Sequence, residues 1–190
     1  MKKQPEITDA TRQKILDAFW MLFKEIEIEK ITVNQISAEA GIHRSSFYRY
    51  FSDIYAVFEA FEHQLLVSIN TEIDTIRKEI NNKDLKMYIN KTSIVLIRYA
   101  DKLHRLLNSS SGEGLKKQLL VNLRENMMIM FDMSDSQEDF DYYVTFVGTM
   151  MVMNLNYWYE HQDKYTYQEI SAKGQAIVED GLMKLQMRSS

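Results

Sequence analysis

The sequence contains no cysteine, only one proline and only six glycines among its 190 residues. Without cysteine the chain can form no disulfide and no thiolate metal site, and it has no cysteine nucleophile. Proline and glycine are the residues that most disfavour helices, so their scarcity predicts an all-α protein. Residues 1–14 are polar and lack the apolar segment of a secretion signal. Together with the missing cysteine this favours a cytoplasmic location.

A strong charge of one sign is also missing. Residues 1–51 carry eight Lys and Arg against seven Asp and Glu, a net of +1, whereas residues 52–190 carry fifteen against twenty, a net of −5. Binding to phosphates needs local positive charge rather than a basic chain. The charge balance therefore leaves nucleic-acid binding open and does not by itself predict it.

No apolar run is well suited to cross a membrane. Residues 142–159 carry no charged side chain over eighteen positions, but threonines and asparagines interrupt this stretch. Its length lies at the low end of the ~17–25 residues that a spanning helix needs. Apolar residues make up 45% of the chain, enough for a sizeable core. We therefore expect a helix buried on two sides, and no membrane partner.

Apolar side chains recur at helical spacing through most of the chain, which predicts about nine helices. Capping patterns mark three helix starts: Thr32 with Gln35, Asp53, and Thr166 with Glu169. The expected helices cover residues 8–26, 33–40, 44–51, 54–80, 85–107 with a bend near 99–102, 115–131, 138–161 and 167–187. We expect two domains, formed by residues 1–53 and 54–190.

The second and third expected helices have the pattern of a helix-turn-helix motif. Gly41, Ile42 and His43 form a three-residue connection, the geometry in which the second helix enters the major groove of DNA. The exposed face of that helix carries arginine, serine and tyrosine side chains and no acidic residue. Arginine can donate two hydrogen bonds to a guanine edge, and hydroxyl groups can donate to phosphate oxygens. An ordinary helical bundle would explain a buried Phe47 and Phe51, but not this outward face.

The helix-turn-helix segment and the residues around it resemble a known family. The segment ITVNQISAEAGIHRSSFYRYF, residues 31–51, is similar to the signature of the TetR/AcrR family, and the resemblance extends over residues 8–58. It implies a sequence-specific transcriptional regulator, a repressor, that binds double-stranded DNA at a palindromic operator as a homodimer. The residues that it places at DNA are Thr32, Ser46 and Tyr48 for phosphates, Asn34, Arg44 and Ser45 for bases, and Arg49, Tyr50 and His43 at the same surface.

Three positions depart from the family pattern. Ile54 replaces a lysine that usually contacts phosphate, and Glu27 replaces a glycine after the first helix. His43 replaces the usual serine cap. It could have a local structural role, contact DNA, or become charged below pH ~6.5. These departures keep an alternative open, a helical protein-interaction module derived from this fold with weak or lost DNA binding.

The second domain is rich in methionine, with ten of the twelve methionines after residue 80. Methionine can line an adaptable apolar pocket, although it can also simply fill a helical core. The family resemblance implies an unidentified small-molecule effector, apolar or aromatic, and no other cofactor. The candidate ligand-binding residues are Tyr88, Tyr99, Met127, Met130, Phe131, Phe146, Met150 and Asn154. Asn154 stands in an apolar run, where it could face a ligand or satisfy a backbone carbonyl.

The last two expected helices are candidates for the dimer interface, because the first of them is apolar on two faces and the second has a stripe of small and apolar residues. Two such helices from each subunit would form a four-helix bundle. The expected interface residues are Phe140, Tyr143, Val147, Met151, Trp158, Gly174, Ile177, Val178, Gly181 and Leu182.

Enzymatic activity is not expected from this sequence. The four histidines have no metal-ligand spacing, so no metal site and no catalytic residue is predicted. The segment Ser109–Gly114 is rich in serine and glycine, but it lacks the lysine of a phosphate-binding loop and follows no strand, which indicates a polar turn.

Overall fold

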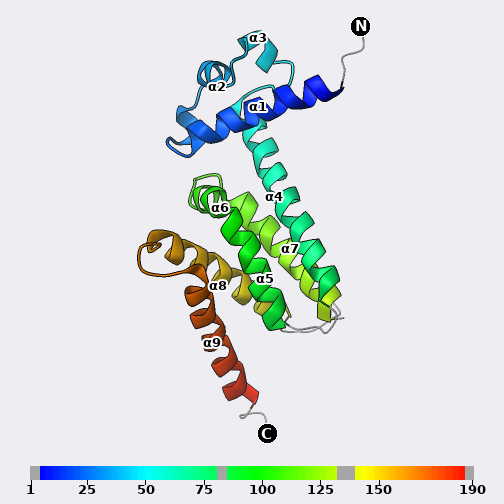
Figure 1. Ribbon diagram of the computed structural model, residues 1–190, viewed down its shortest axis with the longest axis vertical. Helices are drawn as coiled ribbons and strands as arrows, with labels where there is room; N and C mark the ends of the chain where they lie inside the picture. Colours follow the sequence, from blue (N-terminus) through cyan, green and yellow to red (C-terminus); the bar gives the residue numbers. More distant parts are fainter. Residues whose placement is uncertain (1–4, 81–84, 132–139, 187–190) are drawn as a thin grey trace. The chain divides into compact units, whose positions relative to one another are not determined.

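A computed structural model describes the backbone of residues 5–80, 85–131 and 140–186, and the side chains of most of them. Within these ranges every regular element is helical, which confirms the expected all-α class (Figure 1). The helices are α1 (Pro5–Phe23), α2 (Val33–Glu39), α3 (Arg44–Phe47), α4 (Ile54–Glu79), α5 (Leu85–Arg98), α6 (Ala100–Leu107), α7 (Glu113–Phe131), α8 (Phe140–Glu160) and α9 (Tyr167–Gln186), with a 3-10 turn, η1, at Ile28–Lys30.

The predicted helix starts are confirmed by their hydrogen bonds. The Thr32 Oγ1 atom accepts from the Gln35 backbone at 3.2 Å while the Gln35 side chain accepts from the Thr32 backbone at 2.9 Å, which is a complete capping box. Asp53 Oδ1 accepts from the backbone N–H of Ala56 at 2.9 Å and caps α4. Thr166 and Glu169 exchange the same pair of bonds, at 3.3 and 2.8 Å, before α9. Each cap satisfies backbone donors that the first helical turn leaves free.

Several helices differ in extent from the prediction. The first helix covers Pro5–Phe23 instead of 8–26, and two others differ in ways that bear on the site. The expected helix 44–51 ends at Phe47, and residues 48–50 form turns held by bonds such as Arg49 N–H to the Ser46 carbonyl at 3.2 Å. The expected bend in 85–107 is a full break at Tyr99, whose ψ of 14° departs from helical geometry. The Tyr99 hydroxyl donates to Glu72 Oε1 at 2.8 Å, which fixes the break against α4.

The contacts divide the chain into residues 1–67 and 68–190, called here the N-terminal and C-terminal units. The expected domain boundary after residue 53 stays a prediction, and this division by contacts falls inside α4. The reason is aromatic packing in the N-terminal unit, where the ring of Phe19 lies 6.2 Å from that of Phe58 and 5.6 Å from that of Phe61. Trp20 stacks on Phe61 at 5.7 Å. The first part of α4 therefore belongs to the core formed with α1.

In the C-terminal unit α8 packs against α7 and α9, and α5 and α6 also contact α8. Asn154 of α8 is 4% exposed and lies directly beneath Gly174 of α9. A Cβ atom at Gly174 would stand 2.7 Å from the Asn154 amide nitrogen, so only glycine permits this close approach. None of the helices in the described ranges combines the length and the apolar character needed to cross a membrane.

A Gly112→Ala substitution is expected to lower the free energy of unfolding by about 1–3 kcal/mol, because an added Cβ would overlap the Leu106 carbonyl group. Urea denaturation would measure this change. Gly114→Ala is the matched control, since nothing lies within 4 Å of the position where its Cβ would stand. That change lies in α7 and should instead stabilise by about 0.5–1 kcal/mol. Equal effects of the two substitutions would contradict this account.

Glu62 of α4 should make stability fall as the pH rises. Burial, and secondly the neighbouring charge of Glu59, raise the pKa of Glu62 from 4.5 to about 7. Its Oε1 atom has no hydrogen-bond partner among the described residues. A carboxyl group with a raised folded-state pKa costs nothing below pH 4.5, where it is protonated in both states, and its cost is complete above pH 7.

Glu62→Gln is therefore expected to raise the free energy of unfolding by about 1–2 kcal/mol at pH 8 and to change it little at pH 4.5. The value at pH 8 is smaller than the full pKa difference would give, because water still reaches part of the Glu62 side chain. Urea denaturation at the two pH values tests this. Glu25→Gln, at an exposed position of the same unit, is the control and should have little effect at either pH. A gain of the same size at pH 4.5 would show that ionisation of Glu62 is not the cause.

Candidate DNA-binding surface and candidate ligand pocket

The turn between α2 and α3 depends on Gly41. Its φ is +64°, a left-handed conformation that favours glycine. The following residue, Ile42, donates its N–H to the Ser37 carbonyl at 2.9 Å, which closes the end of α2. Ile36 of α2 and Phe47 of α3 are both completely buried. These two anchors fix the orientation of α3 and leave its other side facing solvent.

The outward side of α3 and the turn after it carries Arg44, Ser45, Tyr48 and Arg49, all exposed. The Arg44 Nη2 atom donates to the Tyr48 hydroxyl at 3.1 Å, and its guanidinium group lies 5.5 Å from the centre of the Tyr48 ring. Arg49 Nη2 donates to Ser46 Oγ at 3.1 Å. The two arginines are thus held by neutral partners, and no ion pair neutralises them among the described residues. We call Arg44, Ser45, Ser46, Tyr48 and Arg49 the α3 surface.

The remaining predicted DNA contacts lie near the α3 surface in the sequence but differ in exposure. Thr32, Asn34 and His43 are exposed, and Tyr50 is half-buried. The Thr32 hydroxyl donates to Gln35 Oε1 at 2.8 Å, so its hydrogen is engaged within the cap. His43 precedes α3 but makes no capping hydrogen bond with its side chain. The contacts of all these residues with DNA stay predictions.

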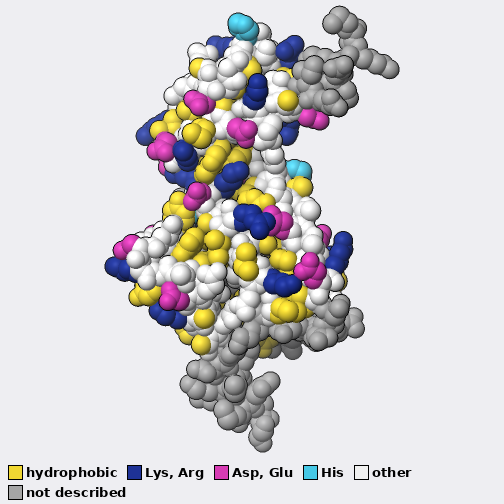
Figure 2. Space-filling model, viewed as in Figure 1, with side chains coloured by type: hydrophobic (Ala, Val, Ile, Leu, Met, Phe, Trp, Pro, Cys, Tyr) yellow, Lys and Arg dark blue, Asp and Glu magenta, His cyan; other side chains and the backbone are white. Residues whose placement is uncertain are grey.

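Ile54 occupies the first position of α4 and is half-buried, so no ammonium group stands there to reach a phosphate. On the face of the molecule that Figure 2 shows, basic and acidic side chains are interspersed over the N-terminal unit. This agrees with the net charge of only +1 in residues 1–51. Any DNA affinity would therefore depend on a few placed groups rather than on a broad basic patch.

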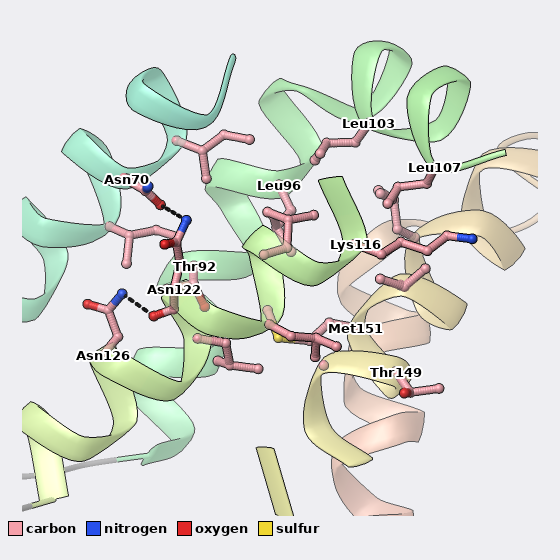
Figure 3. A pocket seen from close by; sticks show the side chains of 18 of the residues that line it. Asn70, Thr92, Leu96, Leu103, Leu107, Lys116, Asn122, Asn126, Thr149 and Met151 are labelled. Carbon is pink, nitrogen blue, oxygen red and sulfur yellow. Dashed lines mark hydrogen bonds between the residues drawn. The ribbon is translucent and has the colours of Figure 1, made fainter. Parts of the chain in front are cut away.

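The C-terminal unit contains a pocket of about 330 Å³ among α4, α5, α6, α7 and α8 (Figure 3). This volume lies at the lower end of the ~300–1,000 Å³ that small-molecule sites occupy. Most of the lining is aliphatic: Ile69, Ile73, Leu96, Leu103, Leu107, Leu119, Leu120, Leu123, Met151, Val152 and Leu155. Gly148 also lines it, and a Cβ there would overlap the Leu120 side chain. The pocket is thus mostly apolar and of a size that suits one small molecule.

Polar groups occupy the two ends of this pocket. At one end Asn122 Nδ2 donates to Asn70 Oδ1 at 3.1 Å, and Asn126 Nδ2 donates to the Asn122 backbone carbonyl at 2.8 Å. Thr149 and Lys116 lie at the opposite side of the view in Figure 3. None of the described residues that line the pocket is acidic. We call Asn70, Asn122 and Asn126 the asparagine cluster.

Of the predicted ligand-binding residues whose side chains are described, only Tyr88 lines this pocket. Burial raises the pKa of Tyr88 to about 12, so its hydroxyl stays protonated at neutral pH. Tyr99 bonds to Glu72 instead, and Phe146 is 44% exposed on α8. The others lie elsewhere or outside the described side chains: Met127 packs with Phe140 and Val144, Met150 and Asn154 pack against Gly174, and Met130 and Phe131 have no described side chain.

The predicted dimer residues are also divided by the structure. Several serve the chain's own packing: Phe140 and Val147 are buried, Met151 lines the pocket, Trp158 packs edge-on against Tyr167 at 5.6 Å, and Gly174 covers Asn154. Tyr143 and Ile177 are exposed, Ile177 by 69%. Val178, Gly181 and Leu182 lie outside the described side chains. The exposed apolar side of α8 is formed by Tyr142, Tyr143, Phe146, Met153 and Tyr157.

Sequence reasoning missed the asparagine cluster. Asn122 and Asn126 are one helical turn apart on α7, at positions next to the apolar Leu119 and Leu123. An amide pair at this spacing within an apolar stripe is the signal that could have indicated a polar group inside a pocket. Nothing in the local sequence connects them to Asn70, which is 52 residues away and becomes a neighbour only in the folded unit.

Comparison with known proteins supports the assignment of the N-terminal segment. Residues 15–61 match the family model of bacterial regulatory proteins of the tetR family. This range covers the second half of α1, all of α2 and α3 and the beginning of α4, and it includes every predicted DNA contact. Comparison with curated protein sequences gives no match.

Solved structures of low sequence identity share the fold. The fatty acid degradation regulator FadR from Bacillus halodurans has a TM-score of 0.70 at 17% identity, with 93% of this chain and 96% of that chain covered. A tetR-family transcriptional regulator from Streptomyces coelicolor has a TM-score of 0.66 at 12% identity, with 87% and 77% covered. FadR from Thermus thermophilus, in complex with lauroyl-CoA, has a TM-score of 0.57 at 14% identity, with 90% and 94% covered.

The family match lies on the segment that carries the helix-turn-helix, and the structural similarity extends over most of the described helices. Residues 15–61 therefore match the N-terminal segment of bacterial regulatory proteins of the tetR family, and the described helices share the fold of solved transcriptional regulators of that family.

Proposed function

We propose that the protein is a dimeric transcriptional repressor that binds a palindromic DNA operator through the α3 surface and changes its DNA affinity when a small-molecule effector occupies the pocket. The observation that carries the proposal is the exposure of Arg44, Ser45 and Tyr48 on the solvent side of α3. These are the hydrogen-bonding groups that reach base edges and phosphates when such a helix enters the major groove. The family match at residues 15–61 supports the same role.

Helix α4 is the element that would couple ligand to DNA. Its first part supplies Phe58 and Phe61 to the aromatic core of the N-terminal unit, which positions α2 and α3. Its second part supplies Ile69, Asn70 and Ile73 to the pocket wall. A ligand that favours one position of the pocket wall would act on the same helix that supports the reader. A coupling of ~1–3 kcal/mol is enough for a useful switch.

The exposed apolar side of α8 supports a homodimer. Tyr142, Phe146, Met153 and Tyr157 are each 44–66% exposed, and Ile177 of α9 is exposed as well. Large apolar side chains gathered in this way are typical of protein interfaces. A two-fold pair of chains would present two α3 surfaces to successive major grooves, which explains why the operator is expected to be palindromic. Phe146→Asp should convert the dimer to a monomer in analytical ultracentrifugation.

The DNA-binding role can be tested without knowing the operator. The purified protein would be mixed with a pool of random 30-base-pair duplexes, and bound DNA would be separated by gel shift and sequenced over several rounds. We expect enrichment of a palindrome, and a loss of affinity for it as salt rises from 50 to 200 mM. Failure to enrich any sequence would favour the alternative, a helical interaction module that has lost DNA binding, for which the isoleucine at position 54 is the supporting feature.

A further inference from the structure

The asparagine cluster keeps hydrogen-bonding capacity that the described chain does not use. Asn70 Oδ1 accepts from Asn122, but the Asn70 Nδ2 donors have no protein partner among the described residues. The same is true of Asn122 Oδ1 and Asn126 Oδ1, because the bonds of these two residues use their nitrogens and the Asn122 backbone carbonyl. Each side-chain amide offers two donors and one acceptor oxygen. A molecule in the pocket therefore meets both donors and acceptors at this end.

A purely apolar ligand is disfavoured by this arrangement. Such a ligand would displace water from the asparagine cluster without forming hydrogen bonds in its place. A polar group left without a partner carries its full desolvation penalty. A site that provides hydrogen bonds discriminates strongly against molecules that lack the matching group. The ligand that suits this end of the pocket has a polar atom of its own.

A charged group is disfavoured as well. Among the described residues that line the pocket there is no Asp or Glu to pair with a cation, and the one charged side chain is that of Lys116. The ammonium group of Lys116 points away from the asparagine cluster in Figure 3, and 43% of its side chain is exposed. The charges near Tyr88, on Arg77 and Asp74, already pair with each other at 2.8 Å. A carboxylate or ammonium at the cluster would be desolvated without a counter-charge.

We propose that the pocket selects an uncharged amphiphile, a molecule with an apolar body and one amide, carbonyl or hydroxyl group that bonds to Asn70 and Asn122. The proposal rests on the proposed function of the pocket as an effector site. It assigns the selectivity of that site to side chains that sequence reasoning did not find. The aliphatic lining holds the body, and the asparagine cluster determines which head group is accepted.

The test compares four probes with the same eight-carbon body and different head groups: octanamide, 1-octanol, octanoate and octylammonium. Isothermal titration at pH 7 would measure their affinities for the full-length protein. Octanamide and 1-octanol should bind at least tenfold more tightly than octanoate and octylammonium. A tightest complex with octanoate or octylammonium would overturn the proposal.

Variants assign the preference to the cluster. Asn122→Leu keeps the side-chain size and should reduce the preference for octanamide over octanoate to less than threefold. Asn122→Asp places a carboxylate at the same point and should make octylammonium the preferred probe, which tests the proposal even if the leucine variant does not fold. Gln118→Leu, an exposed amide on the same helix, is the control and should leave the order unchanged. An unchanged order in both Asn122 variants would overturn the proposal.

The DNA experiment separates this inference from the proposed function. If the probes bind in the expected order and octanamide leaves the affinity for the enriched palindrome unchanged, the head-group selectivity stands and the effector role fails. If octanamide changes DNA affinity but the head-group order is absent, the effector role stands and the asparagine assignment fails. If no probe binds at millimolar concentration, the inference and the effector role both fail, whatever the DNA affinity.

Discussion

An Arg44→Ala variant is expected to bind the operator about fivefold to 150-fold more weakly than the unmodified protein, equivalent to ~1–3 kcal/mol for one bidentate contact with a guanine. The hydrogen bond from Arg44 to the Tyr48 hydroxyl and the position of its guanidinium group 5.5 Å from the centre of that ring favour one orientation of the side chain. DNA binding therefore restricts the Arg44 side chain less than it would restrict a freely rotating arginine. Gel shift or fluorescence anisotropy on the enriched palindrome would measure the loss.

Two further variants show whether Arg44 reads bases or only contributes charge. Arg44→Lys keeps the charge but loses the planar pair of donors, so it should recover little of the affinity for the palindrome. Lys117→Ala removes a cation from an exposed position of α7 and changes the net charge by the same amount. It should leave operator binding within twofold. Full recovery by lysine would show that Arg44 acts on phosphates, in which case affinity should fall equally for all sequences.

The parts of the fold that could be predicted from the sequence are those that local chemistry determines. The Thr32 and Thr166 caps and the start of α4 at Asp53 follow from side chains bonding to backbone groups three residues away. Gly41 ends α2 because a left-handed turn is needed there. The extent of α3 could not be predicted in the same way, because its residues remain compatible with a helix beyond Phe47.

The pocket could not be predicted because it is a property of several helices. Met127, Met150 and Asn154 have the residue types expected of a ligand site, but the rotation of α7 and α8 turns them toward Phe140 and Gly174. That rotation depends on packing between segments far apart in the sequence. The same packing brings Asn70 to Asn122. Periodicity identifies which face of a helix is apolar, but it does not identify which apolar face borders an empty volume.

The largest effect on stability is expected from Phe19→Ala. Phe19 is completely buried, and its ring packs against those of Phe23 at 5.3 Å, Phe61 at 5.6 Å and Phe58 at 6.2 Å. Removing such a ring from a core costs about 3–5 kcal/mol. The N-terminal unit has fewer than seventy residues and correspondingly little core, so this loss should unfold much of it. DNA binding should be abolished at 25 °C.

The same variant tests whether the two units are independent. The pocket is lined only by residues of the C-terminal unit, from Ile69 onward, so octanamide affinity should stay within threefold of the unmodified value. Circular dichroism should show a partial loss of helix, followed by a second transition on heating. Met21→Ala is the control, because Met21 lies on the solvent-exposed side of α1. It should preserve both DNA binding and octanamide binding. Loss of both DNA binding and octanamide binding in Phe19→Ala would contradict independent units. It would mean that the two units unfold together through α4. The coupling between ligand and operator would then be strong as well.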